Sequence, residues 1–274
     1  GSENTATGGL TLDANTTGVN NNAFGYAALG SNTTGQSLCA FGAYALDANT
    51  TGNDHTAVGK GALSACTTSN QNTAIGSVAL EVLTTGGANT ATGYKAGGAV
   101  TTGDGNALFG HQAGDALTTG GGNTFIGRDA GGATTTASNN VAIGYNAAQV
   151  NDTGDGFVVI GYRAGAALTA GSTQNTFIGY EAGAAVTTGD SNTFVGANAG
   201  DACTTAGTNT AVGAQSGTAI TTGANNTFLG ATSGDAVTTG TQNVAVGSAA
   251  LTACTTSSDN TALGFLAGGA INTG

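Results

Sequence analysis

The chain has 274 residues, of which 50 are glycine and only 7% are charged, and it lacks proline, methionine and tryptophan. Its net charge of −11, with only four Lys and Arg residues, argues against a nucleic-acid partner, because neutralising phosphates requires clustered basic side chains. No run of about 20 consecutive apolar residues occurs, so we expect no membrane insertion.

A glycine that ends the consensus pentapeptide Asn-Thr-Ala-x-Gly recurs along the whole chain. In chain order it falls, at intervals of 17 residues, at Gly8, Gly25, Gly42, Gly59, Gly76, Gly93, Gly110, Gly127, Gly144 and Gly161. The next interval, to Gly179, is 18 residues, after which the glycines continue at intervals of 17 to Gly264. We place one inserted residue between Thr169 and Gln174, where a turn can absorb it as a bulge.

The residues just before each of these glycines, the Thr-Ala-Ile segment, are predicted to lie in a β-strand. They are rich in Thr, Val and Ile, which favour strands, and a 17-residue unit is too short for a repeat built from a pair of helices. We therefore predict an all-β fold, a parallel β-solenoid (β-roll or β-helix) of sixteen 17-residue coils. Residues 1–274 would form a single solenoid domain, and we expect it to be a segment of a longer fibrous protein.

The facing of the strands decides which side chains meet solvent. With the glycine as position 0, we predict that position −1 points inward and position −2 outward. Position −2 is apolar in every coil, so it would form an exposed stripe. The candidate interface stripe consists of Leu108, Phe125, Val159, Phe177, Phe194 and Phe228. The reverse facing is the alternative, and it also leaves an apolar stripe outside. We expect identical chains to cover the stripe by packing about a shared axis, giving a homo-oligomer.

Positions 1 and 2 carry all four basic residues and all six tyrosines, so this corner is predicted to face solvent. Its densest part is a candidate binding ridge formed by Tyr94, Lys95, His111, Arg128, Tyr145, Tyr162, Arg163 and Tyr180. Tyrosine offers a flat apolar face and a hydroxyl group, so one hypothesis is that the ridge contacts a glycan or a neighbouring subunit. The alternative is an ordinary solvated corner.

Asn occupies position −4 in thirteen of sixteen coils, which predicts a structural ladder of stacked amides.

The side chains that could serve in catalysis or metal binding are not grouped in a way that would allow either. The four cysteines are expected to behave as small apolar residues, and the two histidines, His55 and His111, lie at different phases. The carboxylates stand in isolated coils without long loops. We therefore predict no catalytic, cofactor-binding or metal-binding residues, and no enzymatic activity.

Several segments carry a family resemblance. Residues 209–213, 140–144 and 243–247 read Asn-Thr-Ala-Val-Gly, Asn-Val-Ala-Ile-Gly and Asn-Val-Ala-Val-Gly, and they resemble the Asn-x-Val-Ala-Ile-Gly unit of trimeric autotransporter adhesin heads. Residues 175–189 are similar to the repeats of bacteriophage tail-fibre shafts. The resemblance implies a trimeric spacer or receptor-binding shaft, extracellular or on the virion surface.

Two other functions stay open at this point. One is an ice-binding solenoid, since flat Thr arrays on β-coils can match an ice lattice; the adjacency of the Thr pair at positions 8 and 9 argues against it, because neighbouring strand residues point to opposite faces. The other is an end-to-end self-assembling filament or surface-layer subunit that joins through open strand edges.

Overall fold

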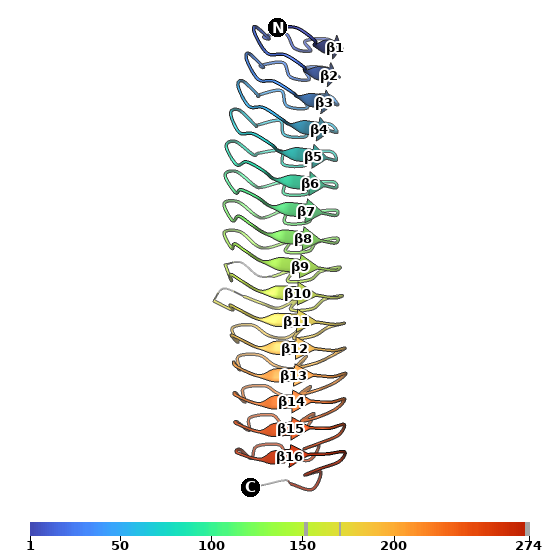
Figure 1. Ribbon diagram of the computed structural model, residues 1–274, viewed down its shortest axis with the longest axis vertical. Coiled ribbons are helices and arrows are strands. Elements are labelled where there is room, and N and C mark those ends of the chain that lie inside the picture. The colour runs from blue at the N-terminus through green and yellow to red at the C-terminus, as the bar shows by residue number, and fades with distance from the viewer. Residues whose placement is uncertain (151–152, 170, 272–274) are drawn as a thin grey trace. The chain divides into compact units, whose positions relative to one another are not determined.

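The computed structural model describes residues 1–150, 153–169 and 171–271. These residues form a parallel β-solenoid in which each coil contributes one three-residue strand (Figure 1). The chain divides into two units, Gly1–Asn139 with strands β1 to β8 and Asn140–Gly274 with strands β9 to β16. The predicted fold class is confirmed, whereas the prediction that residues 1–274 form a single domain remains a prediction.

The strands of the first unit pair in chain order. They are β1 (Thr5–Thr7), β2 (Asn22–Phe24), β3 (Cys39–Phe41), β4 (Thr56–Val58), β5 (Thr73–Ile75), β6 (Thr90–Thr92), β7 (Ala107–Phe109) and β8 (Thr124–Ile126). Each residue pairs with the one 17 positions later, as Thr56 does with Thr73. Like residues therefore stack in columns from coil to coil.

The second unit repeats this arrangement. Its strands are β9 (Val141–Ile143), β10 (Val158–Ile160), β11 (Thr176–Ile178), β12 (Thr193–Val195), β13 (Thr210–Val212), β14 (Thr227–Leu229), β15 (Val244–Val246) and β16 (Thr261–Leu263). Val158 pairs with Thr176, 18 positions later, which confirms one extra residue between β10 and β11. Within the predicted insertion at 169–174, Ala170 lies outside the described residues.

The predicted facing of the strands is wrong, and the alternative is correct. The side chain of Phe177, at position −2, is 0% exposed, whereas that of Ile178, at position −1, is 37% exposed. All six residues of the candidate interface stripe are fully buried, so they cannot contact another chain: Leu108, Phe125, Val159, Phe177, Phe194 and Phe228. The physical reason is that every coil after the first encloses position −2 together with Ala or Ser at position 3 and further apolar columns, and position −1 must then point out.

The core keeps its volume by exchanging large and small residues between two columns. Where position −2 is Ala, as at Ala57, position 4 of the same coil is often a buried Leu, as at Leu63. Where position −2 is Phe, position 4 is Gly, as at Phe194 and Gly200. Position 4 also has a positive φ, +53° at Leu63 and +58° at Gly200, and glycine adopts that conformation without strain. The two columns therefore fill one shared space.

The predicted asparagine ladder is present. In one step of the ladder, Asn106 Nδ2 donates to Asn89 Oδ1 in the preceding coil at 3.0 Å and to the Gly120 carbonyl in the following coil at 3.0 Å. The backbone N–H of Asn106 also donates to Asn89 Oδ1 at 2.9 Å. Because these amides are buried, their hydrogen bonds remove the cost of leaving polar groups unpaired and join successive coils.

Candidate interaction surfaces

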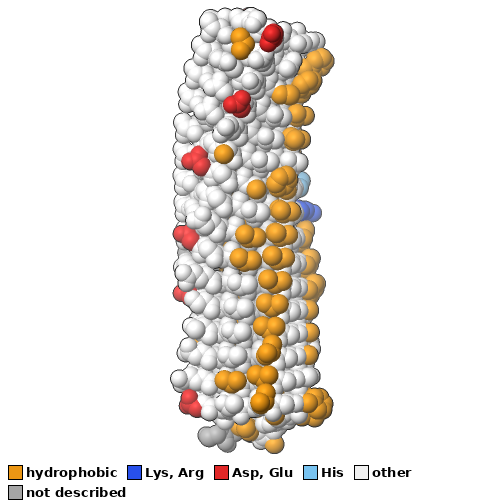
Figure 2. Space-filling model, in the orientation of Figure 1, with side chains coloured by type: hydrophobic (Ala, Val, Ile, Leu, Met, Phe, Trp, Pro, Cys, Tyr) orange, Lys and Arg blue, Asp and Glu red, His pale blue; other side chains and the backbone are white. Residues whose placement is uncertain are grey.

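The position −1 side chains make an exposed apolar column on the strands of each unit, named here the outer strand column. Exposed hydrophobic side chains gather in columns over the strands (Figure 2). The more exposed members are Phe24, Phe41, Val58, Ile75, Phe109, Ile126, Ile178, Leu229 and Leu263. Phe24 and Phe41 stack on each other with ring centroids 6.0 Å apart. The apolar stripe expected from the sequence thus exists, but with other residues.

The strand residues at position −3 share this outward face, because they lie two residues from position −1. Most of them are Thr, such as Thr73 beside Ile75 and Thr193 beside Val195. Strands such as β5, β11 and β12 therefore present one hydroxyl-bearing residue and one aliphatic residue to solvent, and Thr176 and Ile178 of β11 lie in register with Thr193 and Val195 of β12.

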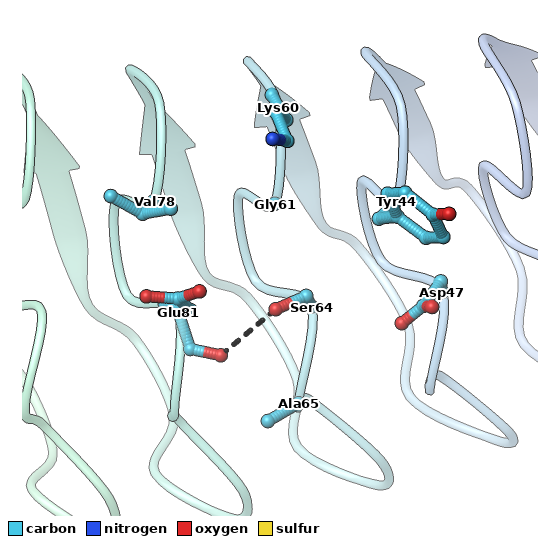
Figure 3. Close-up of a pocket in the computed structure, with 8 residues that line it drawn as sticks. All are labelled: Tyr44, Asp47, Lys60, Gly61, Ser64, Ala65, Val78 and Glu81. Atoms are coloured by element: carbon cyan, nitrogen blue, oxygen red, sulfur yellow. Dashed lines mark hydrogen bonds between the residues drawn. The ribbon is translucent and has the colours of Figure 1, made fainter.

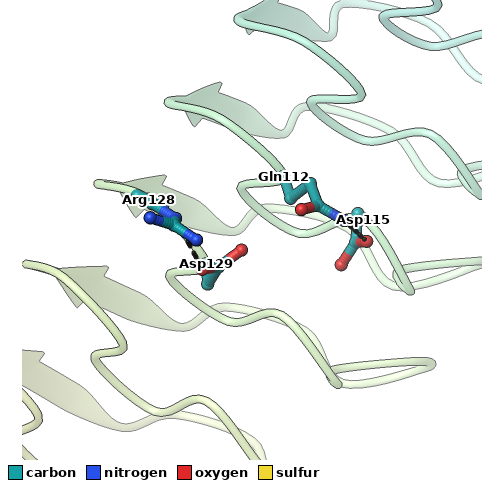
Figure 4. Close-up of polar contacts among 4 residues, drawn as sticks. All are labelled: Gln112, Asp115, Arg128 and Asp129. Carbon is teal, nitrogen blue, oxygen red and sulfur yellow. Dashed lines mark hydrogen bonds and ion pairs between the residues drawn. The ribbon is translucent and has the colours of Figure 1, made fainter.

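The first unit holds four of the predicted ridge residues. Tyr94 and His111 lie against each other with ring centroids 5.3 Å apart and an interplanar angle of 32°. Arg128 Nε pairs with Asp129 Oδ2 at 3.1 Å, and the neighbouring coil carries a hydrogen bond from Gln112 Nε2 to Asp115 Oδ2 (Figure 4). Lys95 is exposed at position 2. The corner is thus solvent-facing, as predicted.

The second unit holds the other four ridge residues, which lie close together. Tyr162 stacks on Tyr145 at 5.6 Å and on Tyr180 at 5.2 Å, each with an interplanar angle of 10°. Arg163 Nη1 pairs with Glu181 Oε1 at 3.5 Å. Since the rings cover one another's faces, a partner would meet mainly ring edges and hydroxyl groups. This geometry favours hydrogen bonding over stacking of sugar rings along the ridge.

A shallow hollow of about 400 Å³ opens in the first unit, at the corner between positions 1 and 6 (Figure 3). It exists because the middle coil has no side chain at Gly61 and only a small one at Ser64. The coils on either side supply larger residues, and its lining consists of Tyr44, Asp47, Lys60, Gly61, Ser64, Ala65, Val78 and Glu81. Ser64 Oγ donates to the Glu81 carbonyl at 3.2 Å, which closes the floor.

The charged groups around the hollow are not paired with each other. Within the described part of the chain, Lys60 forms no ion pair with Asp47 or Glu81. Partial burial raises the pKa of the Asp47 carboxyl, against a smaller lowering by a hydrogen bond from the Ala48 backbone. The hollow thus gathers two acceptor carboxylates, one donor ammonium and one aromatic ring on a shared surface.

One buried cluster departs from the repeat. His55 replaces the ladder asparagine in its coil, and its Nδ1 accepts the backbone N–H of Asn72 at 3.1 Å. The ring must therefore carry its proton on Nε2, which lies 2.8 Å from the Ser69 carbonyl and 3.5 Å from Cys66 Sγ. Burial lowers the pKa of His55 and raises that of the Cys66 thiol. Both side chains lie inside the coil, so we assign the cluster a structural role.

Sequence reasoning missed this cluster and the hollow. The signal for the cluster was present, because coil 4 departs from the consensus three times, with His55, Cys66 and Ser69 at positions −4, 7 and 10. The hollow has a weaker signal, the run of Tyr44, Gly61 and Val78 at position 2 in successive coils. Predicting the hollow from sequence requires knowing that the side chains at positions 2 and 5 lie on the same corner of the coil.

The remaining cysteines are also part of the packing. All four are free thiols, and Cys66, Cys203 and Cys254 are buried. Burial raises the pKa of Cys203 to about 12. Across residues 1–150, 153–169 and 171–271, no group of three or more His, Cys, Asp or Glu side chains is placed to hold a metal ion. The same residues include no helix long and apolar enough to cross a membrane.

No family model, curated protein or solved structure matches this chain.

Proposed function

We propose that the chain is a structural or adhesive fibre shaft, outside the cell or on a virion, whose copies associate through the outer strand column, most simply as a homotrimer. The observation that carries the proposal is the outward apolar column itself. Aromatic or aliphatic side chains such as Phe41, Ile75 and Ile178 point away from the core in coil after coil. Extended apolar strips of this kind usually mark a contact surface.

A second copy of the same chain is the partner that this column fits best. Its side chains recur at the spacing of adjacent strands, about 4.8 Å, and only a partner with the same rise per coil keeps that register over many coils. Identical chains satisfy this condition at once, and a closed arrangement about a common axis would cover every column equally. The Thr residues at position −3 would then lie at the rim of the contact.

The molar mass in solution tests the proposal. Light scattering coupled to size-exclusion chromatography should give about three times the 25.8 kDa of one chain at micromolar concentration. A folded monomer over a wide concentration range would contradict self-association. A mass that grows without limit, with filaments in electron micrographs, would favour the end-to-end assembly instead.

One observation favours a second function, that of an ice-binding face. The Thr residues at position −3 and the aliphatic residues at position −1 point from the same face, as at Thr193 with Val195 and Thr210 with Val212. This array, in register between adjacent strands, is the arrangement that the adjacent Thr pair at positions 8 and 9 could not supply. Thermal hysteresis in a monomeric sample would establish ice binding in place of the shaft function. A sample without thermal hysteresis would contradict ice binding.

A further inference from the structure

The hollow at Tyr44 combines an exposed aromatic ring with charged side chains of both signs. Its walls come from the coils of β3 and β5, and its floor is the coil of β4 (Figure 3). We propose that this hollow binds a neutral sugar ring, such as a hexose unit of a surface glycan.

The aromatic wall is available to such a ligand. Tyr44 is exposed and meets Tyr26 of the preceding coil at 76°, with centroids 5.5 Å apart. On the side of the following coil, the same position is Gly61, so no side chain there covers the Tyr44 ring. The stacked tyrosines of the second unit differ, since each ring there lies flat against the next. An open ring face can pack against the C–H face of a sugar.

The polar groups fit the hydroxyl groups of a sugar. The carboxylates of Asp47 and Glu81 flank the floor and accept hydrogen bonds, and the ammonium group of Lys60 at the rim donates them. An anionic ligand would face two carboxylates, and a cationic ligand would face Lys60. A neutral ligand with several hydroxyl groups can use all three groups at once, and sites of a few hundred cubic ångströms commonly combine an apolar wall with a few such groups.

The role of this site in attachment rests on the proposed adhesive function, but sugar binding itself does not require self-association. A monomeric chain could bind the sugar, and a trimer could fail to bind it. The mass of each sample is therefore measured together with binding, so that the two proposals fail separately.

Saturation-transfer NMR on the full chain provides the test, with methyl glycosides of glucose, galactose and mannose as neutral probes. Sialic acid serves as the anionic probe and glucosamine as the cationic probe. We expect at least one neutral glycoside to bind in the millimolar range, more tightly than either charged probe. Binding of only the charged probes, or of none, would overturn the proposal.

Two variants locate the site. Ser64→Gln fills the floor with a side chain that the same position carries at Gln149, and Tyr44→Ala removes the wall at a position where Ala27 has a similar positive φ. Both should weaken binding at least 10-fold. The matched control is Thr218→Gln. Thr218 holds position 5, as Ser64 does, and Asp201 and Asp235 hold position 5 in the two adjoining coils. Position 2 in the coil of Thr218 is Gln215, whereas in the coil of Ser64 it is Gly61.

Thr218 Oγ1 donates to the Asp235 carbonyl just as Ser64 does to that of Glu81, so the control disturbs an equivalent hydrogen bond. It should leave sugar binding unchanged. Thermal melts confirm that each variant folds, and Tyr44→Ala keeps the test decisive if Ser64→Gln does not fold. The assignment of the site would be refuted if a folded Ser64→Gln or Tyr44→Ala variant bound the sugar as well as the wild-type chain does. It would also be refuted if the Thr218→Gln control lost as much sugar binding as these variants.

Discussion

A β-carbon built on Gly131 would lie 2.6 Å from Cδ2 and Cε2 of the Phe125 ring, closer than two such atoms can approach. The lack of a side chain at Gly131 thus leaves the space that the Phe125 ring occupies. Elsewhere the same two positions hold Ala57 and Leu63, which divide the volume in the opposite way. Phe125 and Gly131 are therefore energetically coupled, although they lie six positions apart in the chain.

This coupling predicts a rescue. Phe125→Ala should lower the free energy of unfolding by about 3–5 kcal/mol through the cavity that it leaves. Gly131→Leu alone should also destabilise, because of the clash and because φ is +60° there. The double variant reproduces the Ala57–Leu63 arrangement. Its free energy of unfolding should be about 1–3 kcal/mol higher than the value expected from adding the two single effects. Denaturant unfolding followed by circular dichroism measures all four proteins. Strict additivity would show that the two columns do not share one space.

The outer strand column predicts where charge blocks self-association. Phe41→Lys combined with Ile75→Lys places two ammonium groups on exposed apolar positions, so the chain should stay folded but become monomeric. The control is Thr34→Lys combined with Thr68→Lys, which adds the same charge at exposed residues with the same separation of 34 positions. Light scattering gives the mass of each variant. If the control dissociates as readily as the test variant, net charge rather than the column is responsible.

His55 predicts a dependence of stability on pH. Burial lowers its pKa in the folded state below the ordinary 6.5, so the unfolded chain binds the proton more readily. The contribution of the neutral ring is therefore fully present above pH 6.5 and is lost as the pH falls from there toward the lower folded pKa. An imidazolium ring cannot accept the Asn72 N–H, so the ladder would break at this coil. The hydrogen bond to the Ser69 carbonyl and, to a smaller extent, the Asp54 carboxylate offset only part of this lowering of the His55 pKa.

The His55→Asn variant isolates that effect, because it restores the ladder residue of the other coils. When the pH is lowered from 7.5 to 5, the melting temperature should fall further for the wild-type chain than for the variant. The carboxylates titrate in both proteins, so the difference between the two pH responses belongs to His55. Parallel curves for the two proteins would mean that the ring does not titrate in this range.

The ridge in the second unit predicts a loss of contact without loss of the fold. Replacing Tyr145, Tyr162 and Arg163 by Ala removes two ring contacts and one exposed ion pair, whose combined cost to stability is about 1–3 kcal/mol. The variant should remain folded in thermal melts while its attachment or assembly weakens. Unchanged behaviour in both assays would leave these residues as a self-stacked solvent corner.

The 17-residue period was enough to predict the strands, because each coil must present its hydrogen-bonding groups to the next at the same phase. The buried Asn106 ladder followed from the same regularity. The period does not determine facing, because Ala23 and Phe24 are both apolar and the larger side chain appears the better candidate for a core. Burial of Ala23 goes with burial of Leu29, which fills the space that it shares with Ala23, and this is visible in sequence only through the exchange of large and small residues between positions −2 and 4.

The extra residue between β10 and β11 does not disturb their pairing, since Val159 still lies opposite Phe177 and Ile160 opposite Ile178. The corner between these strands thus tolerates one extra residue without a change of strand register. Gly171 in this corner is exposed and a side chain there would meet open space, whereas Ser172 beside it is buried and donates to the Gly189 carbonyl. We expect a foreign peptide that is inserted at Gly171 and spares Ser172 to leave both strands in register, which makes this corner a point for using the protein as a display scaffold.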